Sequence, residues 1–542
     1  MRHWFFGISA VVLCLVAIAG WLWAPAWLAL LVVVPVIVLG VRDSLQTRRA
    51  VLRNFPIIGH FRYLLEMIRP EINQYFVESN TDGMPFSRNM RSVAYQRAKR
   101  ELETIPFGTQ YDVYEVGYEW FNHSILAINA VENPRIRIGE GRARMPYDAS
   151  VYNISAMSFG SLSANAILAL NGGAKIGGFF HNTGEGAISD HHLEHGGDLV
   201  WQIGTGYFGC RNRDGTFNEE EFVKNAARPT VRMIEIKLSQ GAKPGHGGIL
   251  PSKKVTAEIA RIRGVDMGQD VLSPPCHSAF RTPRELLTFV DKLRELSGKP
   301  VGFKLCVGHR AEFLGICKAM VATGIIPDFI SVDGGEGGTG AAPIEFSNSV
   351  GSPLSDGLVV VHNALEGFGL REKTKIIASG KIITGFQIAK RIAAGADLCN
   401  SARGFMFSLG CIQALRCNAN DCPVGVATQN KRLTKGLVVS QKTQRVANYH
   451  NATVHAFLET LGAAGITHPD WLRPWHIRRR VSETETKTYA EIYSYLNRGD
   501  LLGDKIPEAW RRSMSLSSAD SFRPQAEKAD SDGTSAIKSA AS

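Results

Sequence analysis

The most apolar part of the chain lies at its start. No charged residue occurs from Trp4 to Trp23, a run of 20 residues, or from Ala26 to Val41, a run of 16. A helix that spans a membrane needs about 20 predominantly apolar residues. Pro25 lies between the two runs, where a turn is expected. The pattern predicts a transmembrane helical hairpin over residues 1–41.

Basic residues flank both ends of this hairpin, which favours cytoplasmic termini. They are Arg2 and His3 before it and Arg42, Arg48, Arg49 and Arg53 after it. We therefore expect a multi-pass protein of the inner (plasma) membrane with a cytoplasmic catalytic domain. Two other interpretations remain open: a signal peptide followed by a buried apolar segment, and one bent helix lying in a single leaflet.

Residues 42–110 have the pattern of a basic, amphipathic, helical linker or cap. Between Arg42 and Arg100 there are eleven Lys and Arg residues against five Asp and Glu residues. Such a segment either lies on anionic headgroups or packs as a cap on the domain that follows. At the other end of the chain we predict helices over 441–510, and the Ser- and Ala-rich composition predicts a disordered tail over 511–542.

Short apolar runs alternate with helical patterns in the middle of the chain. The runs are 151–154, 179–181, 231–236, 271–272, 301–305, 329–332, 376–378 and 398–399. Strand and helix alternation predicts parallel βαβ units, and eight such runs predict an α/β fold of the (β/α)8 TIM barrel type over residues 111–440. An open, doubly wound sheet is the competing architecture.

Composition excludes some classes of protein. A hydrophobic fraction of 44% excludes a chain that is mainly disordered. Nine Cys in 542 residues are too few for a disulfide scaffold, so their placement points to metal chemistry in a reducing compartment. The net charge of +11 is concentrated beside the apolar hairpin, and we expect no nucleic-acid partner.

Glycine and basic residues gather at the predicted carboxyl ends of the last strands. The candidates for phosphate binding are Gly337, Gly338, Gly340, Gly380, Arg403 and Gly404. Phosphate sites in TIM barrels are often formed by the loops after strands 7 and 8, where exposed backbone N–H groups suit an anion. FMN, pyridoxal phosphate and a sugar phosphate all fit this pattern.

A lysine, Lys304, interrupts the apolar run 301–305. A buried ammonium is costly unless it is paired. Either the run is an edge strand with a solvated lysine, or the charge faces a flavin ring and stabilises its anionic reduced form.

Three cysteines, Cys411, Cys417 and Cys422, lie close together just after the last predicted strand and are followed by Pro423. Zinc would need a fourth ligand, and no His lies within the motif. The spacing also differs from the paired Cys-x2-Cys of bacterial ferredoxins. Three thiolates suit a cluster of three irons; unrelated buried thiols are the alternative.

Several motifs together resemble the FMN-binding synthase domain of the glutamate synthase family. They are MSFGSLS (157–163), NTGEGA (182–187), EIKLSQGAKPGHGG (235–248), SPP (273–275), GGTGAAP (337–343) and CIQALRCNANDCPVGVATQ (411–429). The resemblance is collinear over residues 110–460. It implies a TIM barrel with FMN and a 3Fe-4S cluster, which reductively aminates 2-oxoglutarate to L-glutamate with hydride from reduced FMN.

The resemblance also assigns roles to individual residues. It implies Glu185 and Lys243 as catalytic residues, and Lys237, Arg263 and Ser158 as ligands of the oxoacid substrate. It implies flavin contacts for Met157, Gln202 and Lys304, and cluster ligation by Cys411, Cys417 and Cys422. For Arg263 and Lys243, a surface helix position and a solvated loop position are the respective alternatives.

The sequence departs from the family pattern at the substrate side. The family motif EGGQLP reads HGGILP here, so Ile249 stands where the family has a substrate-facing Gln. No ammonia-releasing amidohydrolase domain and no NADPH-binding sequence is recognised. We therefore expect a separate electron donor, a reductase or a ferredoxin, and an ammonia-supplying amidotransferase. Alternatives are an electron-relay subunit without amination activity, or a synthase for another pair of amine and oxoacid.

Overall fold

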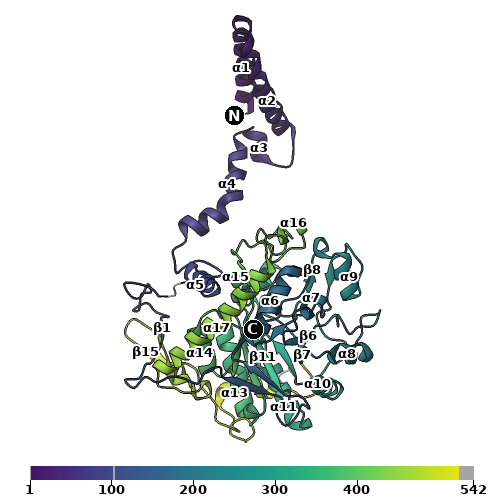
Figure 1. The fold of residues 1–542 in the computed structure, drawn as a ribbon, viewed down its shortest axis with the longest axis vertical. Coiled ribbons are helices and arrows are strands. Elements are labelled where there is room, and N and C mark those ends of the chain that lie inside the picture. The colour runs from purple at the N-terminus through teal and green to yellow at the C-terminus, as the bar shows by residue number, and fades with distance from the viewer. Residues whose placement is uncertain (1, 102–103, 524–542) are drawn as a thin grey trace, which may run out of the picture. The chain divides into compact units, whose positions relative to one another are not determined.

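A computed structural model describes residues 2–101 and 104–523. The chain forms two compact units, residues 1–88 and residues 89–542 (Figure 1). Each unit is described by itself.

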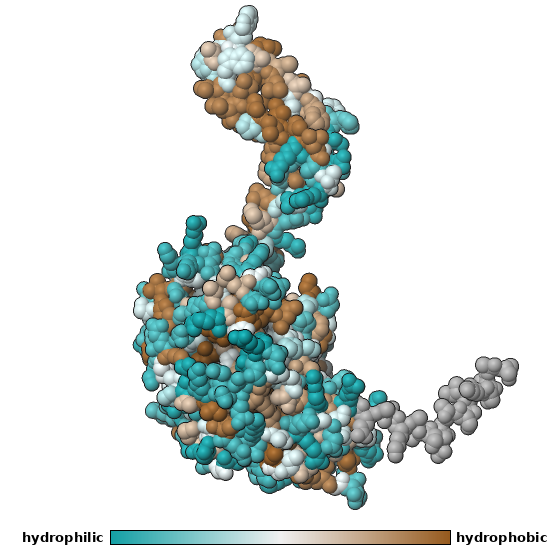
Figure 2. Space-filling view, turned by 90° about the vertical axis from the view of Figure 1, so that its right-hand side faces the viewer, coloured by the Kyte–Doolittle hydropathy of each residue, from teal (hydrophilic) through white to brown (hydrophobic). Residues whose placement is uncertain are grey.

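Two apolar helices form the start of the first unit. They are α1 (Arg2–Leu22) and α2 (Leu30–Leu45), joined by the 3-10 helix η1 (Ala24–Ala29). The segments Arg2–Leu22 and Ala24–Leu45 have mean hydropathies of 2.4 and 2.5 and are almost entirely exposed, and Figure 2 shows them as a largely hydrophobic surface. The predicted helical pair is confirmed. Its length and composition suit two membrane spans or a targeting sequence.

Most of the rest of the first unit is helical, up to residue 77. It contains α3 (Ala50–Asn54), α4 (Gly59–Ile72) and the π-helix η2 (Asn73–Val77). The carboxylate of Asp43 near the end of α2 accepts hydrogen bonds from the Ile57 N–H at 3.0 Å and from His60 at 2.8 Å. After α5 (Arg88–Lys99), residues 104–118 form turns, so the predicted helical segment does not continue to residue 110.

Eight parallel strands of the second unit close into a barrel. In chain order they are β4 (Tyr152–Ile154), β5 (His181–Asn182), β6 (Leu199–Ile203), β7 (Val231–Lys237), β10 (Val301–Leu305), β11 (Phe329–Asp333), β12 (Lys375–Ser379) and β13 (Leu398–Ser401). The last strand, β13, pairs with the first, β4. The (β/α)8 prediction is confirmed, and the open doubly wound sheet is excluded.

Two strand predictions were wrong. The third barrel strand is β6, which the sequence analysis missed, because only the short helix α7 (Asp190–Leu193) separates it from β5. The apolar pair Val271–Leu272 is not a barrel strand. It is β9, which pairs antiparallel with β8 (Ile249–Leu250) within the segment that follows β7.

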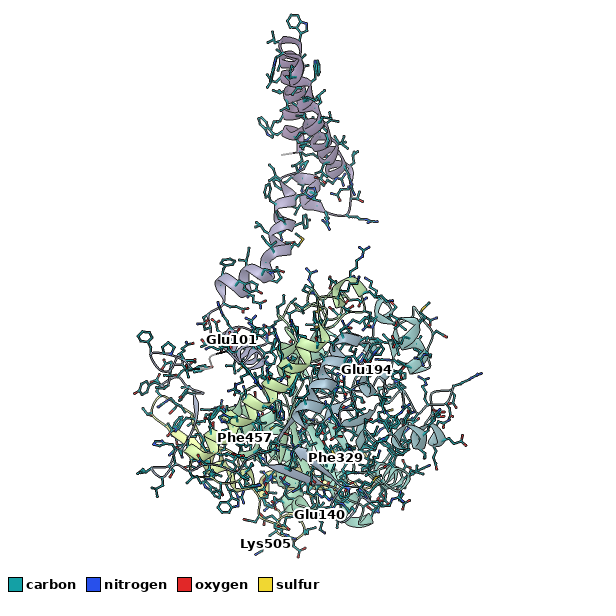
Figure 3. All side chains as sticks on the ribbon, in the orientation of Figure 1. Glu101, Glu140, Glu194, Phe329, Phe457 and Lys505 are labelled. Atoms are coloured by element: carbon teal, nitrogen blue, oxygen red, sulfur yellow. The ribbon has the colours of Figure 1, made fainter. Side chains whose placement is uncertain are left out.

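Helices surround the barrel. After each strand they include α6 (Ala164–Gly177), α8 (Glu219–Ala226), α10 (Pro283–Ser297), α11 (Arg310–Thr323), α13 (Leu354–Gly367), α14 (Gly385–Ala393) and α15 (Arg403–Leu409); α9 (Ala257–Arg263) and α12 (Ile344–Ser349) lie in loops. The long helix α17 (Val439–Ala463) packs on α6, where a side chain at Gly173 would collide with Val446. Phe329 and Phe457, labelled in Figure 3, are both fully buried.

The C-terminal part contains more than the predicted helices. Strand β14 (Ile477–Arg480) pairs with β1 (Glu119–Phe121) and β15 (Thr486–Thr488). Short helices follow, including α18 (Tyr489–Ile492) and α19 (Glu508–Leu516). Trp510 and Met514 of α19 are buried, so the predicted disordered tail is wrong for residues 511–523. Residues 524–542 lie outside the described residues.

Acidic residues stand immediately before three barrel strands, at the amino-terminal end of the barrel, and one of them, Asp328, is buried. Asp328 precedes β11 and forms ion pairs with Arg142 and Arg294, each at 3.0 Å. In the same position, Asp198 before β6 pairs with Arg232 at 2.7 Å. Asp397 before β13 pairs with Arg371 at 2.9 Å. Each of these three aspartates therefore has an arginine partner.

Candidate active site

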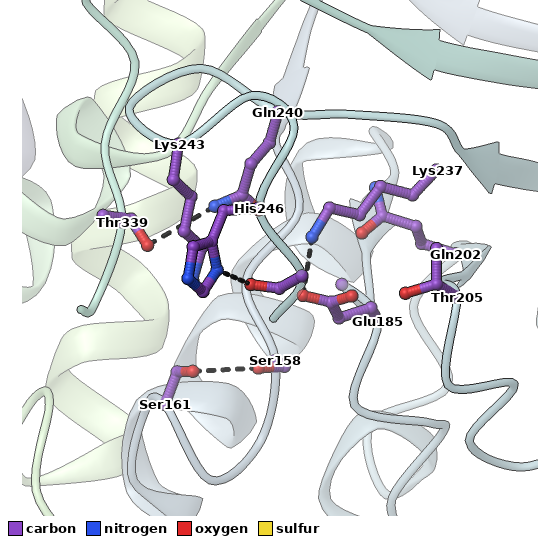
Figure 4. Close-up of polar contacts among 12 residues, drawn as sticks. Ser158, Ser161, Glu185, Gln202, Thr205, Lys237, Gln240, Lys243, His246 and Thr339 are labelled. Atoms are coloured by element: carbon purple, nitrogen blue, oxygen red, sulfur yellow. Dashed lines mark hydrogen bonds and ion pairs between the residues drawn. The ribbon is translucent and has the colours of Figure 1, made fainter. Parts of the chain in front are cut away.

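The opposite, carboxyl-terminal end of the barrel carries a buried ion pair. Lys237 is the last residue of β7, and Glu185 lies in the loop after β5. The Lys237 Nζ and Glu185 Oε1 atoms are 2.6 Å apart (Figure 4). Burial alone would raise the pKa of Glu185, but Lys237, Lys243 and Arg263 together hold it below its ordinary value. Glu185 is therefore a carboxylate at neutral pH.

Lys243 lies in the loop that follows β7 and is buried. Its Nζ atom donates a hydrogen bond to the Ala341 carbonyl at 3.0 Å. Burial and the charge of Lys237 lower the pKa of Lys243 to about 8, against the opposing effect of Glu185. The alternative interpretation of Lys243 as a solvated loop charge is wrong, because the side chain is buried.

Arg263 ends α9 and is also buried, with 5% of its surface exposed. Its Nη2 atom donates to the Phe159 carbonyl at 3.0 Å, and its guanidinium carbon lies 5.3 Å from the centre of the Phe208 ring. Burial lowers its pKa to about 10, although Glu185 opposes this. The surface-helix interpretation of Arg263 is wrong.

Ser158 and Met157 lie in the loop after β4. The Ser158 hydroxyl is 3.1 Å from that of Ser161 and 3.5 Å from Arg263 Nη2. Met157 is buried. The structure thus brings Ser158 close to Glu185, Lys237 and Lys243 (Figure 4), and also to Arg263.

Polar side chains also line the interior of the barrel. The Gln202 amide donates to Glu235 at 2.6 Å, and Lys304 pairs with Asp333 at 3.2 Å. Burial alone would lower the pKa of Lys304, but the carboxylates of Asp333, Glu235 and Glu185 raise it above its ordinary value. Because β10 lies between β7 and β11, the edge-strand interpretation of Lys304 is wrong.

The predicted phosphate residues follow β11, β12 and β13. Arg403 Nη2 donates to the Glu336 carbonyl at 2.7 Å, and a side chain at Gly338 would press against the Arg403 guanidinium. Arg403 and Lys381 lie close enough that Arg403 adds to the effect of burial in lowering the pKa of Lys381. The carboxylate of Glu336 acts on both cations in the opposite direction.

The predicted glycines differ in what surrounds them. At Gly404 a side chain would collide with the Tyr449 hydroxyl and Ser401, so protein packing explains that glycine. A side chain at Gly337 would meet the Gly334 carbonyl oxygen, and one at Gly380 would meet the Leu354 side chain. A Cβ atom added at Gly340 would have only the Ser161 side chain within 4.0 Å. This leaves room beside Gly340.

The three predicted cluster cysteines lie in one loop after α15. Burial raises the pKa of Cys411 to about 12, and the neighbouring Cys417 and Cys422 add to this effect. The thiols are therefore near one another. Within residues 2–101 and 104–523, no three His, Cys, Asp or Glu side chains are gathered closely enough to hold a metal ion as they stand.

A lysine that the sequence analysis did not select lies beside this loop. Lys254 is 2% exposed, and its Nζ atom donates to the Ser161 carbonyl at 2.9 Å and the Ala427 carbonyl at 3.0 Å. Burial lowers its pKa to about 8, which Cys417 and Cys422 partly counteract. The sequence around Lys254 contains no motif that would mark it as a functional residue. Its hydrogen-bond partners, Ser161 and Ala427, are distant in sequence.

The donors at this end of the barrel fit a flavin mononucleotide better than a bare metal ion. An amide and an ammonium, those of Gln202 and Lys304, lie inside the barrel, and the cations Lys381 and Arg403 lie at the later strand ends beside a glycine-rich run. Polar donors for a ring and cations for a phosphate are the features that an FMN site requires.

Comparison with known proteins identifies a family match over the segment that contains the barrel and the candidate site. Residues 113–467 match the conserved region in glutamate synthase. The glutamate synthase large subunit-like protein YerD of Bacillus subtilis (strain 168) is 37% identical over 484 residues, which cover 82% of this chain and 92% of that protein. The archaeal glutamate synthase (NADPH) of Methanocaldococcus jannaschii is 38% identical over 322 residues, 59% of this chain and 60% of that enzyme.

Among solved structures, a lactate oxidase of Pediococcus acidilactici aligns with a TM-score of 0.43 at 13% identity, covering 72% of this chain and 94% of that chain. The family assignment comes from the sequence matches. The matched region exceeds half of the chain, and the Bacillus subtilis relative aligns over nearly its whole length, so this chain belongs to the glutamate synthase family.

Proposed function

We propose that this chain is a membrane-anchored oxidoreductase that uses FMN and a 3Fe-4S cluster to reductively aminate 2-oxoglutarate, or a related oxoacid, to L-glutamate or the matching amino acid. One observation supports the amination chemistry most directly. Lys237, Lys243 and Arg263 converge on Glu185 at the carboxyl-terminal end of the barrel, where TIM-barrel enzymes have their active sites.

The charges in this group suit an oxoacid. Lys237 is neutralised by Glu185, which leaves the positive charges of Lys243 and Arg263 for carboxylates of the substrate. Guanidinium groups bind carboxylates through paired, charge-assisted hydrogen bonds. Ser158 hydrogen bonds with Arg263 and would help to orient the bound carboxylate.

Proton transfers accompany the loss of water from the carbonyl carbon. Ammonia replaces the keto oxygen, and that oxygen must gain protons to leave as water. Lys243, with a pKa of about 8, is suited to donate one, because a group titrating near the working pH is an efficient general acid. Glu185, held as a carboxylate, is suited to accept a proton from the incoming ammonia.

Two bound groups would supply the electrons. FMN, contacted by Met157, Gln202 and Lys304 and by the basic site at Arg403, would supply hydride to the imine carbon. A 3Fe-4S cluster held by Cys411, Cys417 and Cys422 would pass electrons from a separate donor, a reductase or ferredoxin.

The two apolar helices support a membrane anchor. Their exposed side chains, for example Leu31 at 74% and Trp21 at 85%, are costly in water and favourable in a bilayer. The basic residues that follow α2 favour a cytoplasmic catalytic domain. Carbonate-resistant retention of the full chain in the membrane fraction would support this; release by carbonate would contradict it.

The amination activity is tested with the purified full chain. We expect about one FMN per chain, iron with the electron paramagnetic resonance signal of an oxidised 3Fe-4S cluster, and amino-acid formation from ammonia and 2-oxoglutarate with a chemical reductant. Lys243→Met should slow product formation by roughly 100-fold, while Lys253→Met, at an exposed position in the same segment, should not. Protein that binds neither flavin nor iron would contradict the proposal.

A second function is favoured by one residue. Ile249 replaces an amide that would donate a hydrogen bond to the substrate, and it is only partly buried in β8. A membrane-tethered electron relay without amination would need no such amide. Flavin turnover with a chemical reductant, but without product from any oxoacid and amine pair, would support this alternative. Product from another oxoacid or from methylamine would indicate a synthase for a different pair.

A further inference from the structure

One buried carboxylate connects four strands of the barrel from the inside. Glu235 lies in β7 and is 1% exposed. Its Oε1 atom accepts hydrogen bonds from the side-chain nitrogens of Asn182 at 2.8 Å and Gln202 at 2.6 Å. Its Oε2 atom accepts a hydrogen bond from the Ser331 hydroxyl at 2.5 Å. The three partners stand on β5, β6 and β11, so the Glu235 side chain points into the barrel.

The direction of the Asn182 amide is fixed by two contacts. Its Oδ1 atom accepts a hydrogen bond from the Gly184 N–H at 3.0 Å, so its nitrogen is the atom that faces Glu235. If this amide turned over, its oxygen would face the carboxylate, and both groups would be acceptors without a donor. Burial makes such an unpaired arrangement costly, so Asn182 keeps one orientation.

The same reasoning fixes the direction of the Gln202 amide. Because a carboxylate oxygen accepts hydrogen bonds, the nitrogen of Gln202 must face Glu235 and its oxygen must face away. Among the described residues, no hydrogen bond reaches this oxygen. It is also not one of the sealed polar atoms that lack a partner. The Gln202 oxygen is therefore an acceptor that is open to a ligand.

Lys304 offers a ligand the opposite kind of group in the same interior. Its ammonium is a donor only and pairs with Asp333 at 3.2 Å. The pyrimidine edge of a flavin carries one N–H group, N3–H, between two carbonyl groups. An acceptor for N3–H and a cation for a carbonyl oxygen suit this edge. With the Gln202 amide turned over, its nitrogen would oppose N3–H.

We propose that Glu235 is a positioning residue that sets the direction of the Gln202 amide, so that an acceptor oxygen meets the N3–H group of the flavin. This inference rests on the proposed function, in which Gln202 contacts FMN. Glu235 acts through the Gln202 amide and needs no contact with the flavin itself. The alternative role is a purely structural one, in which Glu235 stabilises the barrel and flavin binding does not depend on it.

Another carboxylate provides a matched control. Glu119 lies in β1, which belongs to a sheet separate from the barrel. Its two oxygens are also both engaged, by the Tyr489 hydroxyl and the Lys390 ammonium, at 2.6 Å each. Glu119→Leu therefore removes a hydrogen-bonded carboxylate without approaching Gln202.

The test is a titration of the full-length apoprotein with FMN and with 3-methyl-FMN, which lacks the N3–H donor, followed by flavin fluorescence. We expect Glu235→Leu to weaken FMN binding roughly 10-fold, as for one lost hydrogen bond, and to reduce the preference for FMN over 3-methyl-FMN. Glu235→Gln should bind FMN as the wild type does, because its oxygen can accept from both amides while its nitrogen donates to Ser331. Glu119→Leu should leave both affinities unchanged.

Gln202→Leu shows whether Glu235 acts through Gln202, and it serves if Glu235→Leu does not fold. We expect it to weaken FMN binding as Glu235→Leu does, and the double variant to bind no more weakly than either single variant.

Wild-type FMN affinity in Glu235→Leu, or additive losses in the double variant, would overturn the inference while leaving the proposed function intact. Where Glu235→Leu does not fold, a Gln202→Leu variant that prefers FMN over 3-methyl-FMN as strongly as the wild type does would overturn it in the same way. Wild-type protein that binds no FMN would overturn both the inference and the proposed function.

Discussion

The two ends of the barrel use buried charge in different ways. At the amino-terminal end, Asp198, Asp328 and Asp397 each precede a strand and each has an arginine partner. At the carboxyl-terminal end, Glu185 alone faces Lys237, Lys243 and Arg263. Each of these three carboxylates is paired within the protein. Charge at the second end is left positive.

We interpret the paired charges at the amino-terminal end as contributing to stability, and the surplus cations at the carboxyl-terminal end as contributing to function. Removing one partner of a buried pair leaves an uncompensated buried charge and is strongly destabilising. A surplus of buried cations is costly in the folded protein itself, as the lowered pKa of Lys243 shows, and is offset only when an anionic ligand binds. Substitutions at the two ends should therefore have opposite consequences.

The largest effect on stability is expected at the amino-terminal end. Arg294→Met would leave the fully buried Asp328 with Arg142 as its remaining ion-pair partner, which should lower the unfolding free energy by about 3–5 kcal/mol. Urea unfolding measures this loss. The exposed pair Arg498–Glu372 provides the control, since Arg498→Met should cost far less. An equal loss in the two variants would remove the distinction between buried and exposed pairs.

Lys243→Met should show the reverse behaviour at the other end. It removes a cation proposed to bind substrate and should lower kcat/KM by roughly 100-fold, as expected for a lost charge-assisted hydrogen bond. The unfolding free energy at pH 7 should stay the same or rise, because burial opposes the charged form of Lys243. Loss of stability as large as that of Arg294→Met would contradict the comparison.

The pH dependence of activity should follow the same lysine. The protonated form of Lys243 is lost as pH rises through about 8, so kcat/KM should fall above that pH. In the unfolded chain the same group keeps its proton up to its ordinary pKa of 10.5, so Lys243 makes stability increase with pH between these two values. Lys243→Arg should move the fall in activity to higher pH; an unchanged profile would assign the titration to another group.

The smallest effect is expected at Ile249. Ile249→Gln restores an amide that can donate to a carboxylate, and one such hydrogen bond is worth about 0.5–1.5 kcal/mol. The KM for 2-oxoglutarate should fall a few-fold. Leu272, which pairs with Ile249 across β8 and β9 and is 66% exposed, is the control position. If Leu272→Gln lowers KM equally, Ile249 does not face the substrate.

The hairpin and the barrel could be predicted because their signals are local. An uncharged run of 20 residues or a regular alternation of strand and helix is visible without knowing the fold. Strand β6 was missed because the helix before it, α7, has only four residues. Strand β9 was misplaced because two apolar residues satisfy the same pattern in a hairpin as in a barrel.

The charged residues of the site were found through family motifs, but their pairings were not. Lys304 was expected to face a flavin alone, whereas Asp333 from the next strand pairs with it. Lys254 carried no signal because its acceptors are backbone carbonyls far away in sequence. Which partners meet depends on strand register and loop packing, and no short pattern encodes either.

The long connection from β7 to α10 carries Lys243, Ile249 and Arg263, together with its own two-stranded hairpin. None of these residues belongs to a strand of the closed barrel. Under the proposed function, the residues that select the substrate therefore lie on one connection, and they can change without disturbing the packed interior of the barrel.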